Sequence, residues 1–188
     1  TQSGTHFNPG IGFEMMNDHT IISGGLSYGW ISPEKSWIYS HGPETRVMYR
    51  TYIDDGTFMN LTNFTGWKFQ TKSQWIANLE LVYNKDRLRD SLEISADRLY
   101  ISPGLYEAFS FRGNLSTPMS KPFYLLFLTE AGQYYDRNRL SMRFQPTWNI
   151  SRHFELGGSY NFDRVLVKKR DLSMTNHIIG IKALYMFD

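Results

Sequence analysis

Two neighbouring segments of the chain alternate strictly between apolar and polar residues, one on each side of a short polar turn at Ser151-Arg152. The apolar positions of the first segment are Leu140, Met142, Phe144, Pro146, Trp148 and Ile150, and those of the second are Phe154, Leu156, Gly158, Tyr160 and Phe162. Alternation with a period of two over roughly ten residues, twice in succession, predicts an antiparallel β-hairpin.

The length of these strands indicates a membrane environment. Strands in soluble sheets usually have ~5–6 residues, whereas a tilted strand needs ~9–11 residues to cross a bilayer. The chain has no apolar run approaching the ~18 residues of a membrane helix, but a barrel needs none because only alternate residues face lipid. The sequence therefore predicts an all-β, antiparallel, meandering transmembrane β-barrel. The alternative is a soluble β-sandwich with aromatic core positions.

The same pattern predicts about nine strands in one barrel segment that spans residues 1–188. Residues 1–18 are rich in turn-forming residues and are expected to form a loop, and the strands are expected within 19–188. Their predicted ranges are 20–30, 37–53, 57–70, 74–84, 105–113, 123–134, 139–150, 154–162 and 175–187. The triplet His41-Gly42-Pro43 predicts a bulge or break in the second strand, and Lys85–Gly104 predicts a long charged connection with short apolar stretches.

The connections fall into two alternating sets, and the longest and most basic ones belong to the same set. Outer-membrane barrels have short periplasmic turns and longer extracellular loops, so we expect that set to lie outside the cell. All five tryptophans lie within a few residues of the opposite set, which predicts an aromatic girdle at one membrane interface. They are Trp30, Trp37, Trp67, Trp75 and Trp148.

Charged residues occupy the inward parity of the predicted strands. An uncompensated charge inside a closed barrel would be costly, so we expect these residues to form a salt-bridged lining of the lumen. The predicted lining residues are Arg46, Arg50, Glu80, Arg112, Glu130, Arg143, Glu155, Asp163 and Lys182.

Several short motifs in order resemble a known family. They are Asn8-Pro9-Gly10-Ile11-Gly12-Phe13, Leu26-Ser27-Tyr28-Gly29-Trp30, Gly66-Trp67-Lys68-Phe69, Thr129-Glu130-Ala131-Gly132, Gly158-Ser159-Tyr160-Asn161-Phe162 with Arg164-Val165, and Ala183-Leu184-Tyr185-Met186. Together they resemble the C-terminal β-barrel region, a domain of unknown function, of bacterial carbohydrate-binding family 9 domain-containing proteins. The resemblance implies a fragment of a longer outer-membrane protein with a sugar-related role and no established catalytic residues. An odd strand number agrees with a fragment, because single-chain bacterial barrels have even numbers.

Some of the polar residues could instead belong to either of two kinds of enzyme, a phospholipase or a glycosidase. Ser173, Asn176 and His177 lie near one rim and are the residue types of an outer-membrane phospholipase, although such a triad depends on geometry. The carboxylates Glu80, Glu130, Glu155 and Asp163 could include a glycosidase pair. A polar lumen lining explains these residues better than either enzyme, so the sequence favours a non-enzymatic role and leaves a hydrolase as the alternative. Sugars stack on aromatic faces, and the candidate sugar contacts are Tyr100, Tyr106, Tyr134 and Tyr135. A place in the aromatic girdle at the membrane interface is the better interpretation of these four residues.

Composition and the lack of certain motifs argue against several other classes of function. The chain has no cysteine, a net charge of +2 and five histidines without metal-site spacing, and it contains no glycine-rich phosphate loop. We therefore expect no metal, no cofactor and no nucleic acid partner. The expected partners are the lipid bilayer and lipopolysaccharide of a bacterial outer membrane, a saccharide, and further envelope subunits. The predicted function is a scaffold, anchor or conduit, with a hydrolase or a barrel subunit of a larger complex as alternatives.

Overall fold

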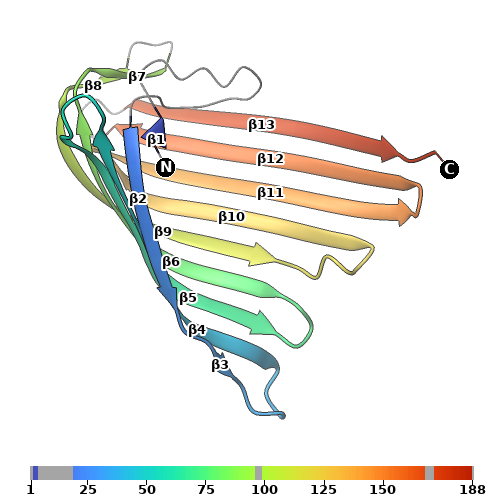
Figure 1. Ribbon diagram of the computed structural model, residues 1–188. Helices are drawn as coiled ribbons and strands as arrows, with labels where there is room; N and C mark the ends of the chain where they lie inside the picture. Colours follow the sequence, from blue (N-terminus) through green and yellow to red (C-terminus); the bar gives the residue numbers. More distant parts are fainter. Residues whose placement is uncertain (1, 4–18, 96–98, 168–171, 188) are drawn as a thin grey trace.

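The computed structural model describes residues 2–3, 19–95, 99–167 and 172–187. Within these residues the regular structure consists of β-strands, and no helix is long and apolar enough to cross a membrane. Nine long antiparallel strands make up most of the described chain (Figure 1). They are β2 (His19–Ser27), β4 (Ile38–Tyr52), β5 (Phe58–Thr71), β6 (Ile76–Leu88), β9 (Gly104–Ser116), β10 (Phe123–Tyr134), β11 (Arg137–Ser151), β12 (Phe154–Val167) and β13 (Leu172–Tyr185).

The long strands follow one another across the sheet in chain order, each antiparallel to the next. Two short strands join the sheet: β1 (Gln2–Ser3) pairs with β2, and β3 (Trp30–Ile31) pairs with β4. The strands β7 (Leu92–Ser95) and β8 (Leu99–Ile101) form a separate hairpin. The prediction of an all-β antiparallel meander is confirmed.

Some predicted boundaries were wrong. Gln2–Ser3 was expected in a loop but pairs with Thr20 and His19, and residues 4–18 lie outside the described residues. The expected connection over 85–104 begins as strand, because β6 continues to Leu88, and it contains the β7–β8 hairpin.

The triplet His41-Gly42-Pro43 contains no break, because all three residues pair with β5, but a register shift of the bulge type lies just before it, between Ile38 and Ser40. The neighbouring strand is also interrupted, between β2 and β3, where the Tyr28 amide donates to the Pro43 carbonyl at 3.0 Å. A Cβ atom on Gly42 would lie 1.8 Å from the Tyr28 carbonyl oxygen, so Gly42 permits the close approach of these two backbones.

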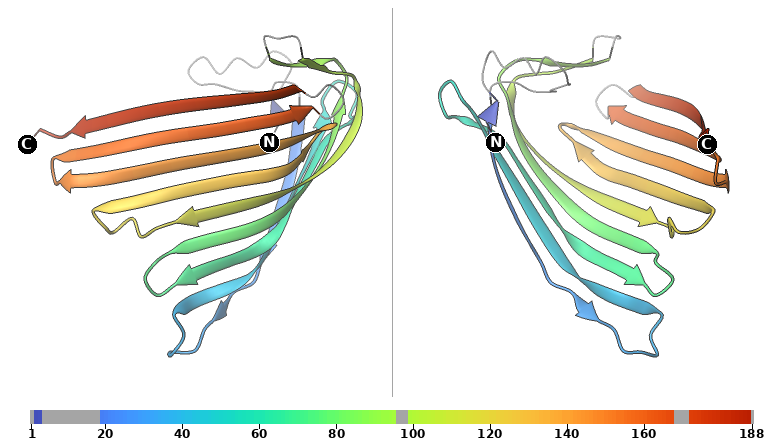
Figure 2. Two further views of the ribbon diagram at one scale, coloured as in Figure 1. Left: turned by 180° about the vertical axis from the view of Figure 1, so that it is seen from behind. Right: turned by 45° about the vertical axis from the view of Figure 1, so that its right-hand side comes forward.

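The sheet is strongly curved and open (Figures 1 and 2). Within the described residues, β1 and β2 form one edge and β13 forms the other, so these strands do not close into a barrel. Because β2 and β13 are the first and last of nine alternating strands, they run in the same direction. Joining them directly would therefore produce a parallel pair.

The two faces of the sheet differ in chemistry. One, which we call the polar face, carries Glu80, Arg112 and their register neighbours, and its central positions Phe64 and Val82 are buried. The other, the apolar face, carries large exposed residues such as Leu79, Phe111 and Ile181. The accessible surface is 13211 Å², whereas a compact monomer of this mass would expose about 9,300 Å². The described strands therefore leave their apolar face uncovered.

Candidate functional site

The nine predicted lining residues all lie on the polar face. One register row crosses five adjacent strands through Glu80, Arg112, Glu130, Ser141 and Asp163. The remaining predicted residues occupy the same parity of their strands: Arg46, Arg50, Arg143, Glu155 and Lys182. Side chains of a strand alternate between the two faces, so this placement follows from the period-two pattern.

Glu80 and Arg46 form the centre of this charged surface. Arg46 Nη2 donates to Glu80 Oε1 at 2.9 Å, and the Glu80 side chain is only 1% exposed whereas that of Arg46 is 57% exposed. Gly66 makes room for the carboxylate, because a Cβ atom there would lie 2.9 Å from Glu80 Cγ. The guanidinium groups of Arg46 and Arg112 lie 5.0 and 4.8 Å from the centre of the Phe64 ring, a cation–π distance. Phe64 thus supports two arginines.

Arg112 and Arg139 each hold a carboxylate with two hydrogen bonds. Arg112 Nη2 and Nε donate to Glu130 Oε2 at 2.7 and 3.1 Å, and the Ser110 hydroxyl binds Glu130 Oε1 at 2.9 Å. Arg139 donates to both oxygens of Asp163 at 2.9 and 2.6 Å. The Arg139–Asp163 contact is bidentate, which fixes the orientation of both groups. Arg139 was missed as a site residue, although its parity already placed it beside Arg143.

The network continues towards both ends of the sheet. Arg50 Nη1 donates to Asn60 Oδ1 at 2.7 Å, and Asn60 in turn binds Asp86. At the other end Lys182 Nζ donates to Glu155 Oε1 at 3.1 Å. Neither Asn60 nor Asp86 was among the predicted residues, since the pairing of β5 with β6 brings them together from 26 positions apart.

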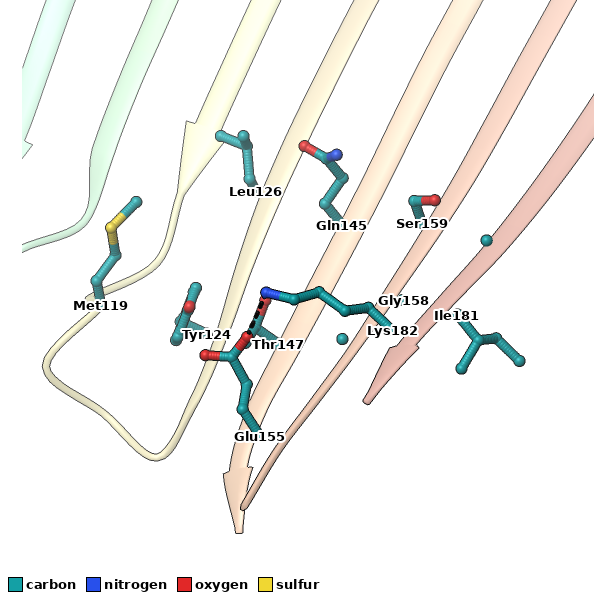
Figure 3. Close-up of a pocket in the computed structure, with 12 residues that line it drawn as sticks. Met119, Tyr124, Leu126, Gln145, Thr147, Glu155, Gly158, Ser159, Ile181 and Lys182 are labelled. Carbon is teal, nitrogen blue, oxygen red and sulfur yellow. Dashed lines mark hydrogen bonds and ion pairs between the residues drawn. The ribbon is translucent and has the colours of Figure 1, made fainter. Parts of the chain in front are cut away.

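Two of the hollows on the polar face lie along the charged network. The central one, of about 270 Å³, is lined by charged residues from β4, β6, β9, β10 and β11. The other, of about 460 Å³, lies over β10 to β13, where Gly157, Ser159 and Gly180 form a low floor. Figure 3 shows the Glu155–Lys182 ion pair in this second hollow, near Tyr124 and Thr147.

The five tryptophans lie near the same ends of their strands, next to the turns at 32–37, 72–75, 117–122 and 152–153. Trp30 and Trp67 stack with ring centres 5.7 Å apart, and His41 lies 5.8 and 5.9 Å from them. The other three are Trp37, Trp75 and Trp148, and all five are at least 37% exposed. The sheet thus presents one row of exposed indole rings.

The candidate sugar-binding tyrosines gather at the opposite ends of the strands. The ring centres of Tyr106 and Tyr135 are 5.3 Å apart, and those of Tyr134 and Tyr135 are 4.8 Å apart, both edge to face. Arg139 covers the Tyr134 ring at 5.1 Å. The side chain of Tyr100 lies outside the described part of the chain. The three described rings form one cluster in which edges and faces already contact one another.

A separate charged cluster fixes the turn between β4 and β5. Arg89 donates to Asp54 at 2.7 Å, to Asp55 at 2.6 Å and to the Thr57 hydroxyl at 2.6 Å, and its guanidinium lies 3.6 Å from the centre of the Tyr52 ring. Hydrogen bonds from the Thr57 amide and hydroxyl, together with those from Arg89, hold the pKa of Asp55 well below its usual range. This clamp connects the end of β6 to a turn more than 30 residues earlier.

The phospholipase-like arrangement is not assembled. Asn176 pairs with Asp163 on the polar face, whereas Ser173 and His177 lie on the apolar face and are separated by roughly 13 Å of strand. His177 Nδ1 instead hydrogen bonds with the Tyr160 hydroxyl at 2.8 Å. The prediction fails because adjacent residues of a strand point to opposite faces.

The four candidate glycosidase carboxylates are each bound by a different cation. Glu80 pairs with Arg46, Glu130 with Arg112, Glu155 with Lys182 and Asp163 with Arg139. In the described part of the chain, no three His, Asp or Glu side chains come close enough together to hold a metal ion. This arrangement favours a polar structural network over a hydrolytic pair.

Comparison with known proteins adds no relative: no family model, no curated protein and no solved structure matches the chain.

Proposed function

We propose that the chain forms part of the wall of a transmembrane β-barrel in a bacterial outer membrane, where it acts as a scaffold, anchor or conduit. The observation that carries the proposal is the separation of the two faces. Ion-paired side chains occupy the polar face, and large exposed apolar side chains occupy the other. The apolar face would suit contact with lipid, and the polar face would suit an aqueous interior.

The distribution of charge on the apolar face supports contact with lipid. In the described strands, its charged residues are Lys85, Arg87, Glu107 and Arg164, in the halves of β6, β9 and β12 next to the connections at 89–103 and 168–171. The apolar positions of β11 from Leu140 to Ile150 span roughly 34 Å along the strand. At a tilt of about 45°, this length would cover the ~25 Å apolar band of a barrel.

The stagger of the strands agrees with such a tilt. One register row joins Ile76, the first residue of β6, to Ser116, the last of β9, and then to Leu126 and Gln145. Gln145 lies six residues before the end of β11 at Ser151. Closing a sheet into a barrel requires tilted and staggered strands. Because β2 and β13 run in the same direction, an antiparallel closure would need an odd number of additional strands, and the two-residue strand β1 pairs antiparallel with β2.

Single-cysteine labelling tests the proposal, because the chain has no cysteine of its own. Phe144→Cys places a thiol on the apolar face of β11, and Gln145→Cys places one on the polar face. In lipid vesicles we expect a water-soluble maleimide to label position 145 and to leave position 144 unlabelled until detergent is added. Arg152→Cys, in an exposed turn, is the positive control. If position 144 reacts as fast as position 152 in vesicles, the proposal is wrong.

The alternative of a subunit in a larger envelope complex predicts that protein, rather than lipid, covers the apolar face. Brominated lipids quench indole fluorescence only on contact, so they separate the two cases. Strong quenching of the exposed tryptophans Trp67 and Trp148 supports a lipid-facing wall. A saccharide-related role rests on the family resemblance, with the Tyr106, Tyr134 and Tyr135 cluster as its candidate contact.

A further inference from the structure

The central hollow of the polar face carries an excess positive charge. Its lining includes three arginines, Arg46, Arg112 and Arg143, and two carboxylates, Glu80 and Glu130. Arg46 and Arg112 each pair with one of these carboxylates. In the described part of the chain, Arg143 has no carboxylate partner, and its Nε donates to the Asn161 amide oxygen at 2.8 Å. The Nη1 and Nη2 atoms of Arg143 are therefore available to an anionic group.

The same hollow contains hydrogen-bond acceptors that lack donors. Glu80 Oε2 and Asn114 Oδ1 are buried, and neither receives a hydrogen bond from the described residues. They lie on the adjacent strands β6 and β9, two positions apart in register. Buried oxygens without donors destabilise the folded state, and a rotation of these two side chains towards the hollow would let hydroxyl groups of an occupant supply the missing donors.

We propose that this hollow binds a small hydroxylated anion of the uronic acid class. The carboxylate of the ligand lies against Arg143, and its hydroxyls donate towards Glu80 and Asn114. A volume of about 270 Å³ is slightly below the ~300–1,000 Å³ usual for ligand sites, which suits one sugar ring rather than an oligosaccharide. The inference rests on the proposed role of the polar face as a water-filled interior.

Calorimetric titration of the protein folded in detergent micelles tests this inference, with sodium D-glucuronate as the probe. Glucose, which lacks the charge, and acetate, which lacks the hydroxyls, are titrated at the same ionic strength because salt screens exposed charges. We expect glucuronate to bind more tightly than either. Arg143→Gln should weaken glucuronate binding roughly tenfold, the loss typical of one charge-assisted hydrogen bond.

Two variants control for general effects of charge. Arg152→Gln removes an exposed arginine from the turn after β11 and should leave the affinity unchanged. Arg143→Lys keeps the charge and should retain part of the affinity. Absence of glucuronate binding, equal binding of acetate, or an unchanged affinity of Arg143→Gln overturns the inference. Because the titration requires no bilayer, its failure is distinct from a failure of the cysteine labelling in vesicles.

Discussion

At the scale of single residues, the Arg46–Glu80 pair is asymmetric, and this asymmetry gives a testable prediction. Arg46→Gln leaves a carboxylate that is 1% exposed without its cation, and we expect a loss of about 3 kcal/mol in the free energy of unfolding. Glu80→Gln leaves an arginine that water can reach, and we expect a loss of about 1 kcal/mol. Urea unfolding in detergent micelles measures both values.

The matched control for that pair is Lys182→Gln, which removes the cation of an ion pair whose lysine side chain is 66% exposed. It should cost less than 1 kcal/mol, as is usual for exposed pairs. Equal losses for Arg46→Gln and Glu80→Gln would show that burial of the carboxylate does not determine the stability of this pair.

Gly66 permits the close approach of β5 to β6. An added Cβ atom would lie 2.2 Å from the Leu79 carbonyl oxygen and 2.8 Å from Glu80 Cα. Gly66→Ala should therefore separate the two backbones and lower the free energy of unfolding by about 1–3 kcal/mol. At Gly24 an added Cβ atom would meet nothing within 4 Å, so Gly24→Ala is the control. Similar unfolding midpoints for the two variants would contradict the explanation.

At the scale of elements, the clamp of Arg89 on the β4–β5 turn should persist into strong acid. The pKa of Asp55 is lowered in the folded protein, so its contribution to stability is present above the ordinary pKa of about 3.9. That contribution is lost only as the pH falls through the lower pKa of the folded state. We expect hydrogen exchange at the Thr57 amide, which donates to Asp55 at 3.0 Å, to keep the same protection factor from pH 7 down to about pH 3, below the ordinary pKa of an aspartate.

Arg89→Ala should reduce the protection of that amide, because the substitution removes hydrogen bonds to Asp54, Asp55 and Thr57. Arg87→Ala removes a neighbouring positive charge that takes no part in the clamp and should have little effect. If both substitutions reduce the protection equally, net charge rather than the clamp stabilises the turn.

At the scale of the whole molecule, the two edges of the described sheet leave backbone hydrogen-bonding groups without a partner strand. The backbone of β13 pairs with β12 on one side, and no described strand pairs with its other side. Unpaired strand edges are templates for further pairing. In an open sheet, alternate amides of β13 exchange rapidly with solvent, whereas in a closed barrel all of them are protected. We expect full protection in the membrane-embedded protein, measured by residue-resolved hydrogen exchange.

The corresponding amides of β11, which is paired on both sides, provide the internal reference for that measurement. If alternate amides of β13 exchange rapidly in the membrane while those of β11 remain protected, the sheet stays open there. Such a result would contradict a closed barrel but would leave the separation of the two faces intact.

The sequence by itself determined the strands and the faces of their side chains. The alternation from Leu140 to Phe162 and the parity of Arg112, Glu130 and Asp163 are local properties, because successive residues of a strand point to opposite faces wherever the strand lies. The number of long strands and the placement of all nine polar residues on one face followed from this period, whereas the short strands β1, β3, β7 and β8 did not.

Only the tertiary structure decided the partners and the closure of the sheet. Glu80 stands opposite Arg112 in register yet is bound by Arg46, two strands away, and Gly42 serves a close contact with Tyr28 rather than a break. The register between neighbouring strands fixes such contacts, and the number of alternating strands fixes the common direction of β2 and β13. The local pattern cannot specify them, because every strand repeats the same alternation.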